Sequence, residues 1–169
     1  MLLGGPPGVG KTSALHYLEH RIPACGIVDA DDVWRVSSDI ETQTHRSIAH
    51  ANVISVAEGY IEAGCQTVIV SWVFARALLY EPVILGLRDK VDTVKQVYLT
   101  AEPEILSARI RQRRSKINKS YSQPLEGIID YSIDRQNLIS SLPYQKLDTS
   151  HRDAEEVGRM LLDELKVDC

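Results

Sequence analysis

The sequence predicts an α/β domain in which helices cover both faces of a parallel β-sheet. A short apolar segment, a glycine-rich loop and a helix-like segment open the chain. Strand-like and helix-like segments then alternate to its end, which is typical of a parallel sheet. Residues 66–71 are rich in β-branched side chains without alternation, as expected of a strand buried on both faces. Right-handed connections between such strands place helices on both sides and give three layers.

Five segments have the apolar character of buried strands. The first has only the four residues before Gly5, although it would lie in the middle of the sheet. The second ends at Asp29, and the others are each followed by a polar loop. In chain order, the expected strands are residues 1–4, 25–28, 66–71, 94–99 and 145–147.

Six helices are expected between and after these strands. The longest has apolar side chains at helical spacing. Pro103, with an acidic residue on each side, fits the first turn of another. Ser150, three residues before Asp153, resembles the N-cap of the last. The expected helices are residues 13–18, 43–63, 78–87, a segment opening at 102, 125–141 and 152–165.

Length and composition favour one globular domain over residues 1–169. Hydrophobic residues make up 44% and charged residues 25% of the chain, which suits an ordinary core and excludes a disordered tail protein. The net charge of −4 creates no general basic field, so neither a nucleic-acid nor a membrane partner is expected. The longest apolar stretch, residues 67–79, is interrupted by Arg76 and is too short to span a membrane.

The cysteines and the start of the chain favour a cytoplasmic protein. Cys25, Cys65 and Cys169 are widely spaced and form no CxxC pair, so reduced thiols are expected rather than a zinc or redox site. No charged leader followed by an apolar segment comes before the glycine-rich loop, so no export signal is expected. The protein is expected to act as a monomer or a homodimer.

The strongest signal for function is the loop at residues 5–12. It reads Gly-Pro-Pro-Gly-Val-Gly-Lys-Thr and matches the phosphate-loop pattern G-x-x-x-x-G-K-[ST] at each fixed position. Glycines let backbone N–H groups turn toward phosphate oxygens, and the following helix adds a favourable dipole. Lys11 would reach the β and γ phosphates, and the Thr12 hydroxyl would ligate Mg²⁺. A glycine-rich helix cap would explain the glycines but not the Lys-Thr pair. The expected nucleotide-binding residues here are Gly5, Pro6, Pro7, Gly8, Val9, Gly10, Lys11, Thr12 and Ser13.

Paired carboxylates follow the second expected strand. Because side chains alternate along an extended backbone, Asp29 and Asp31 would both point to the phosphate side, whereas Asp32 would face away or begin a turn. One carboxylate can hold a water of the Mg²⁺ shell, and a second can accept the proton of an attacking hydroxyl. We assign Asp29 to the magnesium waters and Asp31 to the base. Exchanged roles and a solvated acidic turn are the alternatives.

A basic segment follows the fourth expected strand, with six cations and no acid in residues 105–125. On a helix, Arg109 and Arg113 lie four residues apart, so both could face the nucleotide. The polar residues 112–124 form a candidate lid, whose closure would bring guanidinium groups to the phosphates. Arg135 on the next helix is a further candidate. The alternatives are a solvated cationic face and a nucleic-acid patch, which a single interleaved tyrosine makes weak.

Four residues are candidates for an acceptor pocket. Trp34 and Trp72 could supply its shape, and Arg46 and Arg76 could hold an anionic group. A structural role is equally open for each of them. The five histidines show no metal-ligand spacing.

Four segments together resemble one enzyme group. They are the loop at residues 5–12, Asp29-Ala30-Asp31, Val97-Tyr98-Leu99 before the arginine-bearing helix, and Leu147-Asp148-Thr149-Ser150. The set resembles small P-loop kinases, among them shikimate kinases, gluconate kinases and nucleoside monophosphate kinases. The sequence looks closest to ATPase-like members of this group.

The resemblance implies a P-loop NTPase fold with a five-stranded parallel sheet in the order 2-3-1-4-5, with ATP and Mg²⁺ as cosubstrates. It also implies a lid after the fourth strand and contacts from Thr149 and Arg152 to adenine. Shikimate kinases carry a glycine triplet after the third strand, whereas this chain has Ser71-Trp72-Val73, which argues against shikimate. A mechanical, ring-forming ATPase would carry an acidic pair at the end of the third strand, where this chain has Ser71 and Trp72. This class of ATPase is therefore not expected.

We therefore expect an ATP-dependent phosphotransferase that acts on a hydroxyl or phosphate of a small metabolite or antibiotic. Nucleoside monophosphate kinase activity is the alternative in the same class, and a non-catalytic ATP-binding regulator is the alternative of another class. The expected catalytic residues are Lys11, Asp31, Arg109, Arg113 and Arg135. The expected acceptor-binding residues are Asp31, Trp34, Arg46, Trp72 and Arg76.

Overall fold

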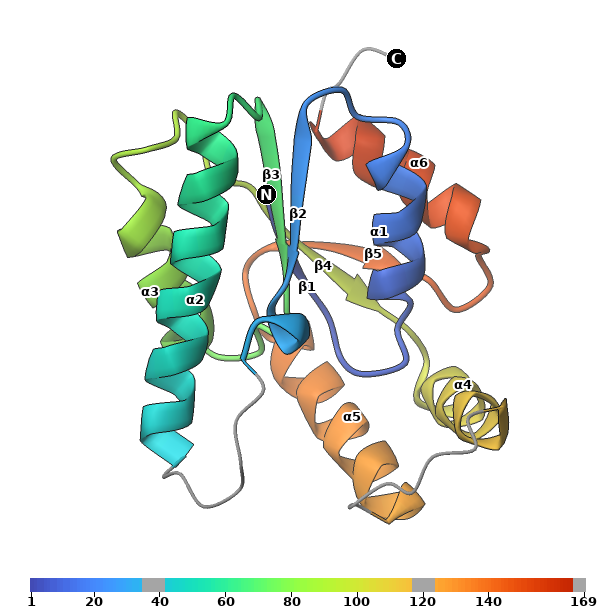
Figure 1. The fold of residues 1–169 in the computed structure, drawn as a ribbon. Helices are drawn as coiled ribbons and strands as arrows, with labels where there is room; N and C mark the ends of the chain where they lie inside the picture. The colour runs from blue at the N-terminus through green and yellow to red at the C-terminus, as the bar shows by residue number, and fades with distance from the viewer. Residues whose placement is uncertain (35–41, 117–123, 166–169) are drawn as a thin grey trace.

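The structure, a computed structural model, describes residues 1–34, 42–116 and 124–165 (Figure 1). Its centre is a five-stranded sheet in the order β2-β3-β1-β4-β5, and each strand runs parallel to its neighbours. The α/β fold class and the order 2-3-1-4-5 are therefore confirmed. The strands are β1 (Leu2–Gly4), β2 (Cys25–Asp29), β3 (Thr67–Ser71), β4 (Gln96–Thr100) and β5 (Gln145–Asp148).

Helices cover both faces of the sheet. Figure 1 shows α2 and α3 on one side and α1 and α6 on the other. One buried apolar cluster joins the sheet to α2, α3 and α5, and a second joins it to α1, α4 and α6. Within the described ranges, no helix is both long and apolar enough to cross a membrane. The helices are α1 (Lys11–Glu19), α2 (Thr42–Glu62), α3 (Ala77–Leu87), α4 (Pro103–Lys116), α5 (Leu125–Ser140) and α6 (Ala154–Leu165).

The central strand β1 has only three residues, as its position in the sequence predicts. Leu2 pairs with Val70 of β3 on one side and with Gln96 of β4 on the other. Three residues are enough to form a stable central strand, because both neighbouring strands hydrogen-bond to β1 and its side chains are buried. The loop that follows therefore lies at the carboxyl ends of the strands, where open α/β sheets bind their ligands.

The prediction that Ser150 caps the last helix is wrong. The Ser150 Oγ donates to Asp148 Oδ1 at 2.7 Å, so this hydroxyl belongs to the turn after β5. Asp153 caps α6 instead. Its Oδ1 accepts from Glu156 N at 2.8 Å, and Glu156 Oε2 accepts from Asp153 N at 3.0 Å. This reciprocal pair is a capping box, in which the long glutamate side chain reaches back to the cap.

Most of the predicted lid, residues 117–123, lies outside the described residues. Residues 112–116 form the last part of α4, and Pro124 directly precedes α5. On either side of the segment, Arg111 of α4 donates to both carboxylate oxygens of Glu126 of α5, at 2.8 and 3.0 Å. The two helices that flank the segment are thus joined by a bidentate ion pair.

Gly158 allows α6 to approach α1 closely. A Cβ on Gly158 would lie 2.1 Å from Tyr17 Cδ1. We expect Gly158→Ala to lower the free energy of unfolding by about 1–3 kcal/mol, because the Tyr17 ring would have to leave its place between the helices. Gly59→Ala in α2 is the matched control, since nothing lies within 4 Å of a Cβ there. It should raise the free energy of unfolding by about 0.5–1 kcal/mol. Chemical denaturation measures both, and an undiminished stability of Gly158→Ala would contradict this packing.

Candidate active site

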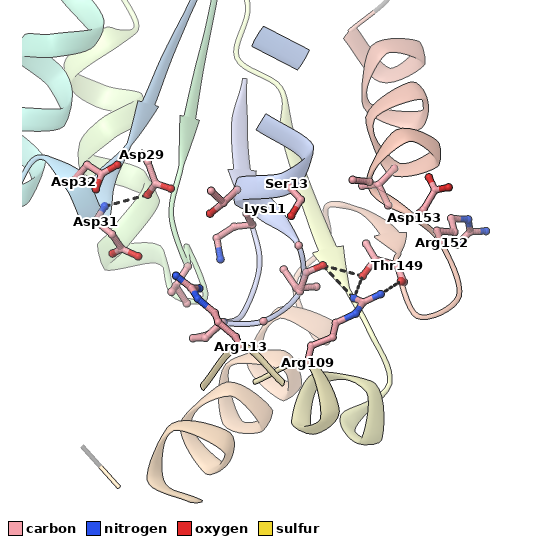
Figure 2. Close-up of a pocket in the computed structure, with 18 residues that line it drawn as sticks. Lys11, Ser13, Asp29, Asp31, Asp32, Arg109, Arg113, Thr149, Arg152 and Asp153 are labelled. Carbon is pink, nitrogen blue, oxygen red and sulfur yellow. Dashed lines mark hydrogen bonds between the residues drawn. The ribbon is translucent and has the colours of Figure 1, made fainter. Parts of the chain in front are cut away.

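The phosphate loop lines a cavity of about 710 Å³ at the carboxyl ends of the strands (Figure 2). The rest of its wall comes from the start of α1, the end of β2 and the turn after it, the loop after β3, α4, the turn after β5 and the start of α6. Figure 2 shows Asp29, Asp31 and Asp32 on one side of Lys11, and Thr149, Arg152 and Asp153 on the other. The predicted site residues that line the cavity are Pro7, Gly8, Val9, Gly10, Lys11, Thr12, Ser13, Asp29, Asp31, Arg109, Arg113, Thr149 and Arg152.

Two loop glycines adopt left-handed backbone conformations, with φ of 81° at Gly8 and 106° at Gly10. A Cβ on Gly8 would also lie 2.8 Å from Ile110 Cγ1 of α4. A side chain at either position would therefore strain the loop. Gly10 is the N-cap of α1, so the N–H groups that lack partners in the first helical turn open toward the cavity.

The Lys11 side chain lies along the loop. Its Nζ donates to the carbonyl oxygens of Gly5 at 2.8 Å and Pro6 at 3.2 Å. Burial lowers the pKa of Lys11 to about 8, although the carboxylates of Asp31 and Asp29 favour the charged form. A phosphate oxygen is a stronger, charged acceptor than these two carbonyls, so the ammonium is well placed to transfer to it.

Three aspartates form the acidic side of the cavity. Asp29 ends β2, while Asp31 and Asp32 lie in the 3-10 turn η1 (Ala30–Asp32). The side chain of Asp29 accepts from Asp31 N at 3.2 Å. This turn, rather than strand alternation, brings Asp31 to the cavity. Of the two alternatives predicted for Asp32, facing away or beginning a turn, the first is wrong, because Asp32 lies in this turn and lines the cavity. Burial is the largest cause that raises the pKa of Asp29, and the neighbouring carboxylates add to it.

Arg109 and Arg113 of α4 both line the cavity, but the structure holds them differently. Arg109 donates to Thr149 through Nη1 to Oγ1 at 3.0 Å and through Nη2 to the carbonyl oxygen at 2.6 Å. Its Nη1 also lies 3.4 Å from Val9 O. Arg113 is exposed, and its charge helps to lower the pKa of Lys11. Arg113 therefore has the freer guanidinium group for a phosphate, while Arg109 braces the turn after β5 against the loop.

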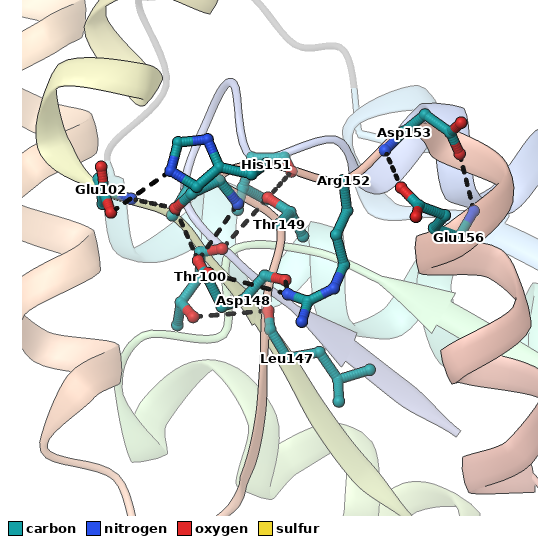
Figure 3. A network of polar contacts seen from close by, with 12 residues as sticks. Thr100, Glu102, Leu147, Asp148, Thr149, His151, Arg152, Asp153 and Glu156 are labelled. Carbon is teal, nitrogen blue, oxygen red and sulfur yellow. Dashed lines mark hydrogen bonds and ion pairs between the residues drawn. The ribbon is translucent and has the colours of Figure 1, made fainter.

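A polar network ties the turn after β5 to β4 (Figure 3). Thr149 N donates to Thr100 O at 2.8 Å. Ser150 Oγ accepts from Glu102 N at 2.9 Å, and both Ser150 N and Oγ donate to Asp148 Oδ1, at 3.2 and 2.7 Å. The network fixes the part of the turn that carries the cavity-lining residues before α6.

Seven predicted site residues are absent from the cavity lining in the described part of the chain: Gly5, Pro6, Trp34, Arg46, Trp72, Arg76 and Arg135. The first two belong to the loop itself, and their carbonyl oxygens accept hydrogen bonds from Lys11 Nζ. Arg46 is half-buried on α2, and Arg76 is exposed as the residue that precedes α3. The Arg135 guanidinium lies over the ring of Tyr131, 4.5 Å from its centre.

The two tryptophans belong to an aromatic cluster. Trp72 makes edge-to-face contacts with Trp34, Phe74 and His50, with ring centres 5.7 to 6.0 Å apart. Trp72 is only 6% exposed and belongs to the apolar core. Its neighbour Val73, rather than Trp72 itself, reaches the cavity wall.

Five lining residues are not among the predicted ones: Asp32, Val73, Asp153, Ala154 and Val157. Asp32 could have been found as the third acid of one short segment, and Asp153 from the capping box that it forms with Glu156. The three apolar residues carry no chemical signal in the sequence, since only the fold brings them to the cavity.

Comparisons with known proteins agree with this architecture. Residues 1–130 match the family model described as AAA domain. A sequence search of curated proteins gave no match.

Solved structures share the fold at low sequence identity. The tunicamycin resistance protein of Deinococcus radiodurans has a TM-score of 0.69 at 17% identity, with 99% of this chain and 95% of that chain covered. A shikimate kinase from Bacteroides thetaiotaomicron has a TM-score of 0.68 at 16% identity, covering 98% and 97%. A gluconokinase from Sinorhizobium meliloti has a TM-score of 0.59 at 13% identity, covering 98% and 90%. The chain therefore belongs to the AAA domain family and has the fold of the small P-loop kinases.

Proposed function

We propose that the protein is an ATP-dependent phosphotransferase that moves the γ-phosphoryl group of ATP to a hydroxyl group of a small molecule. The observation that carries the proposal is one cavity in which the phosphate loop, three arginines and four aspartates meet. Its cationic part suits a triphosphate. Its acidic part suits an acceptor that must lose a proton during transfer.

In the proposed step, the acceptor oxygen forms a bond to the γ-phosphorus while the bond from that phosphorus to the β–γ bridging oxygen breaks. ADP leaves with the electron pair of the broken bond, and the acceptor proton passes to the carboxylate of Asp31. Lys11 and Arg113 stabilise the negative charge that spreads over the phosphoryl oxygens. Asp31 suits the role of base because its backbone N–H is held by Asp29 while its carboxylate faces the cavity.

The oxygen donors fit a magnesium ion that is held mainly by the nucleotide. Among the described residues, no three Asp, Glu, His or Cys side chains gather into a metal-binding group. Mg²⁺ usually binds through one or two protein oxygens together with phosphates and waters. The exposed Thr12 hydroxyl and the Asp29 carboxylate would supply these contacts. Because its pKa is raised, Asp29 would be stabilised in its ionised form by a nearby cation. The bound ion would neutralise phosphate charge.

The acidic part of the cavity favours a hydroxyl acceptor over a phosphate acceptor. A nucleoside monophosphate would bring a dianionic group toward Asp29, Asp31 and Asp32, and like charges at short range repel. Arg46 and Arg76, the candidates for holding an anionic group of the acceptor, are not among the described residues that line the cavity. A neutral or cationic molecule with hydroxyl groups meets no such repulsion.

A screen for acceptor-dependent ADP release tests the proposal. Sugar acids, aminoglycosides, amphenicols and tunicamycin form one arm, and nucleoside monophosphates form the other. Tunicamycin is included because one structurally similar protein is named a tunicamycin resistance protein. We expect a hydroxyl-bearing compound to raise ADP release above the acceptor-free rate. Stimulation by nucleoside monophosphates alone would favour the monophosphate kinase, and ATP binding without any turnover would favour the regulator.

The lowered pKa of Lys11 predicts a pH-dependent affinity. Since only the ammonium form attracts phosphate and its pKa is about 8, binding above this pH requires uptake of a proton. The affinity for ATP should therefore fall about tenfold between pH 7 and pH 9. Lys11→Arg keeps the charge over this range and should flatten the profile. Titration calorimetry at several pH values measures both proteins, and equally flat profiles would contradict the lowered pKa.

A further inference from the structure

We propose that Ser132 and Thr149 are positioning residues for the phosphate loop. Although neither belongs to the loop, their hydroxyl groups hold its backbone in the conformation that directs N–H groups toward a bound phosphate. The inference rests on the proposed function, because it concerns how the loop meets a phosphate. It gives Ser132 a role that its sequence context does not indicate, and it gives Thr149 a role other than contact with adenine.

The loop has few amides with which to bind phosphate. Two of its residues are prolines, which have no N–H group. Gly5 and Val9 donate their N–H groups to protein carbonyls, at 3.3 and 3.4 Å. The loop amides that remain before α1 are those of Gly8 and Gly10, so their direction matters for any anion in the cavity.

The direction of each amide is set by the carbonyl that precedes it. The described residues contain no cis peptide bond. In a trans peptide, the C=O group and the N–H group of the next residue point in opposite directions. The Pro7 carbonyl therefore sets the direction of the Gly8 N–H, and the Val9 carbonyl sets that of the Gly10 N–H.

Hydroxyl groups from distant parts of the chain hold both carbonyls. Ser132 Oγ of α5 donates to Pro7 O at 2.7 Å, and Thr149 Oγ1 lies 2.9 Å from Val9 O. Ser132 is 0% and Thr149 1% exposed, so water does not compete for their hydroxyl groups. With the carbonyls directed to the protein side, the Gly8 and Gly10 amides point away from it, toward the cavity that both glycines line.

Arg109 completes the arrangement at Val9. The Thr149 hydroxyl has one proton and lies within reach of both Val9 O and Thr100 O, the latter at 3.1 Å. Arg109 Nη1 donates to Thr149 Oγ1 at 3.0 Å and also lies 3.4 Å from Val9 O. Two donor groups thus lie within hydrogen-bond distance of the Val9 carbonyl, and the loop is joined to α4, α5 and the turn after β5. Because these donors are already oriented, the loop does not have to reorganise when the anion binds.

Matched variants separate this role from a general structural one. Ser132→Ala and Thr149→Val remove the hydroxyl groups, whereas Thr149→Ser keeps one. Ser140→Ala is the control for Ser132, because Ser140 Oγ of the same helix also donates to a carbonyl, that of Gln136, at 2.9 Å, away from the loop. The probes are MgATP and inorganic tripolyphosphate, measured by titration calorimetry, with the unfolding temperature recorded for each protein.

We expect Ser132→Ala and Thr149→Val to weaken the binding of both probes about tenfold. Thr149→Ser and Ser140→Ala should stay within about twofold of the wild type. Wild-type binding of MgATP with unchanged affinities in both hydroxyl-free variants would overturn the inference and leave the proposed function in place. A lower unfolding temperature with unchanged affinity would also overturn it, as a merely structural role. If Ser132→Ala does not fold, the comparison of Thr149→Val with Thr149→Ser decides the matter. Failure of the wild type to bind MgATP would defeat both proposals.

Discussion

Replacing Lys11 by alanine is expected to weaken ATP binding about 100-fold and to abolish nearly all turnover. The change removes the one ammonium group that lies on the phosphate loop, where it now donates to the carbonyls of Gly5 and Pro6. It also leaves the developing phosphoryl charge without a partner in a partly buried cavity. Titration calorimetry measures the affinity, and ADP release measures the turnover.

Lys90→Ala is the control for this experiment. Lys90 follows α3 at the opposite end of the sheet and pairs with Glu58 at 3.6 Å, so its loss removes a lysine without touching the cavity. Its affinity and turnover should match those of the wild type. A Lys11→Ala protein that binds ATP as tightly as Lys90→Ala would show that the loop does not hold the triphosphate.

Asp31→Asn is expected to lower acceptor-dependent turnover about 100-fold or more, the usual contribution of a general base. The amide cannot accept the acceptor proton, but it has nearly the shape of the carboxylate. ATP affinity should therefore stay within about threefold of the wild type. A loss of affinity as large as the loss of turnover would point instead to a role for Asp31 in binding the magnesium nucleotide.

Two further variants sharpen the assignment. Asp89→Asn changes an exposed aspartate beside Arg88, far from the cavity, and should change neither quantity. Asp29→Asn should mainly weaken the magnesium-dependent part of ATP binding, since Asp29 is assigned to the metal waters. If Asp29→Asn stops turnover and spares affinity while Asp31→Asn does the reverse, the two roles are exchanged. A non-catalytic ATP-binding regulator has no turnover, so neither Asp29→Asn nor Asp31→Asn would change its ADP release.

The fold could be predicted from the sequence because its signals are local. Each buried strand is a short apolar segment, and each helix has its own spacing of apolar residues, so the order of elements follows from the pattern alone. The sheet order came from the resemblance to small P-loop kinases rather than from the pattern. The start of α6 was misplaced because Ser150 and Asp153 both carry capping side chains, and only the turn after β5 decides which is used.

The candidate site could be predicted only in part. The loop and the aspartates of one short segment are visible because their residues are adjacent in sequence. The contacts of Ser132 with Pro7 and of Thr149 with Val9 join residues 125 and 140 positions apart, which no local pattern reports. Likewise, nothing in the spacing of Trp34 and Trp72 distinguishes a pocket wall from the aromatic core to which the buried ring of Trp72 belongs.

Titration of the folded wild-type protein with MgATP tests the central claim most directly, namely that the loop at residues 5–12 binds the nucleotide's phosphates. The account predicts a binding heat that saturates at one nucleotide per chain, together with a rise in the unfolding temperature. Neither heat nor a rise in unfolding temperature, in a protein whose circular dichroism confirms that it is folded, would contradict it.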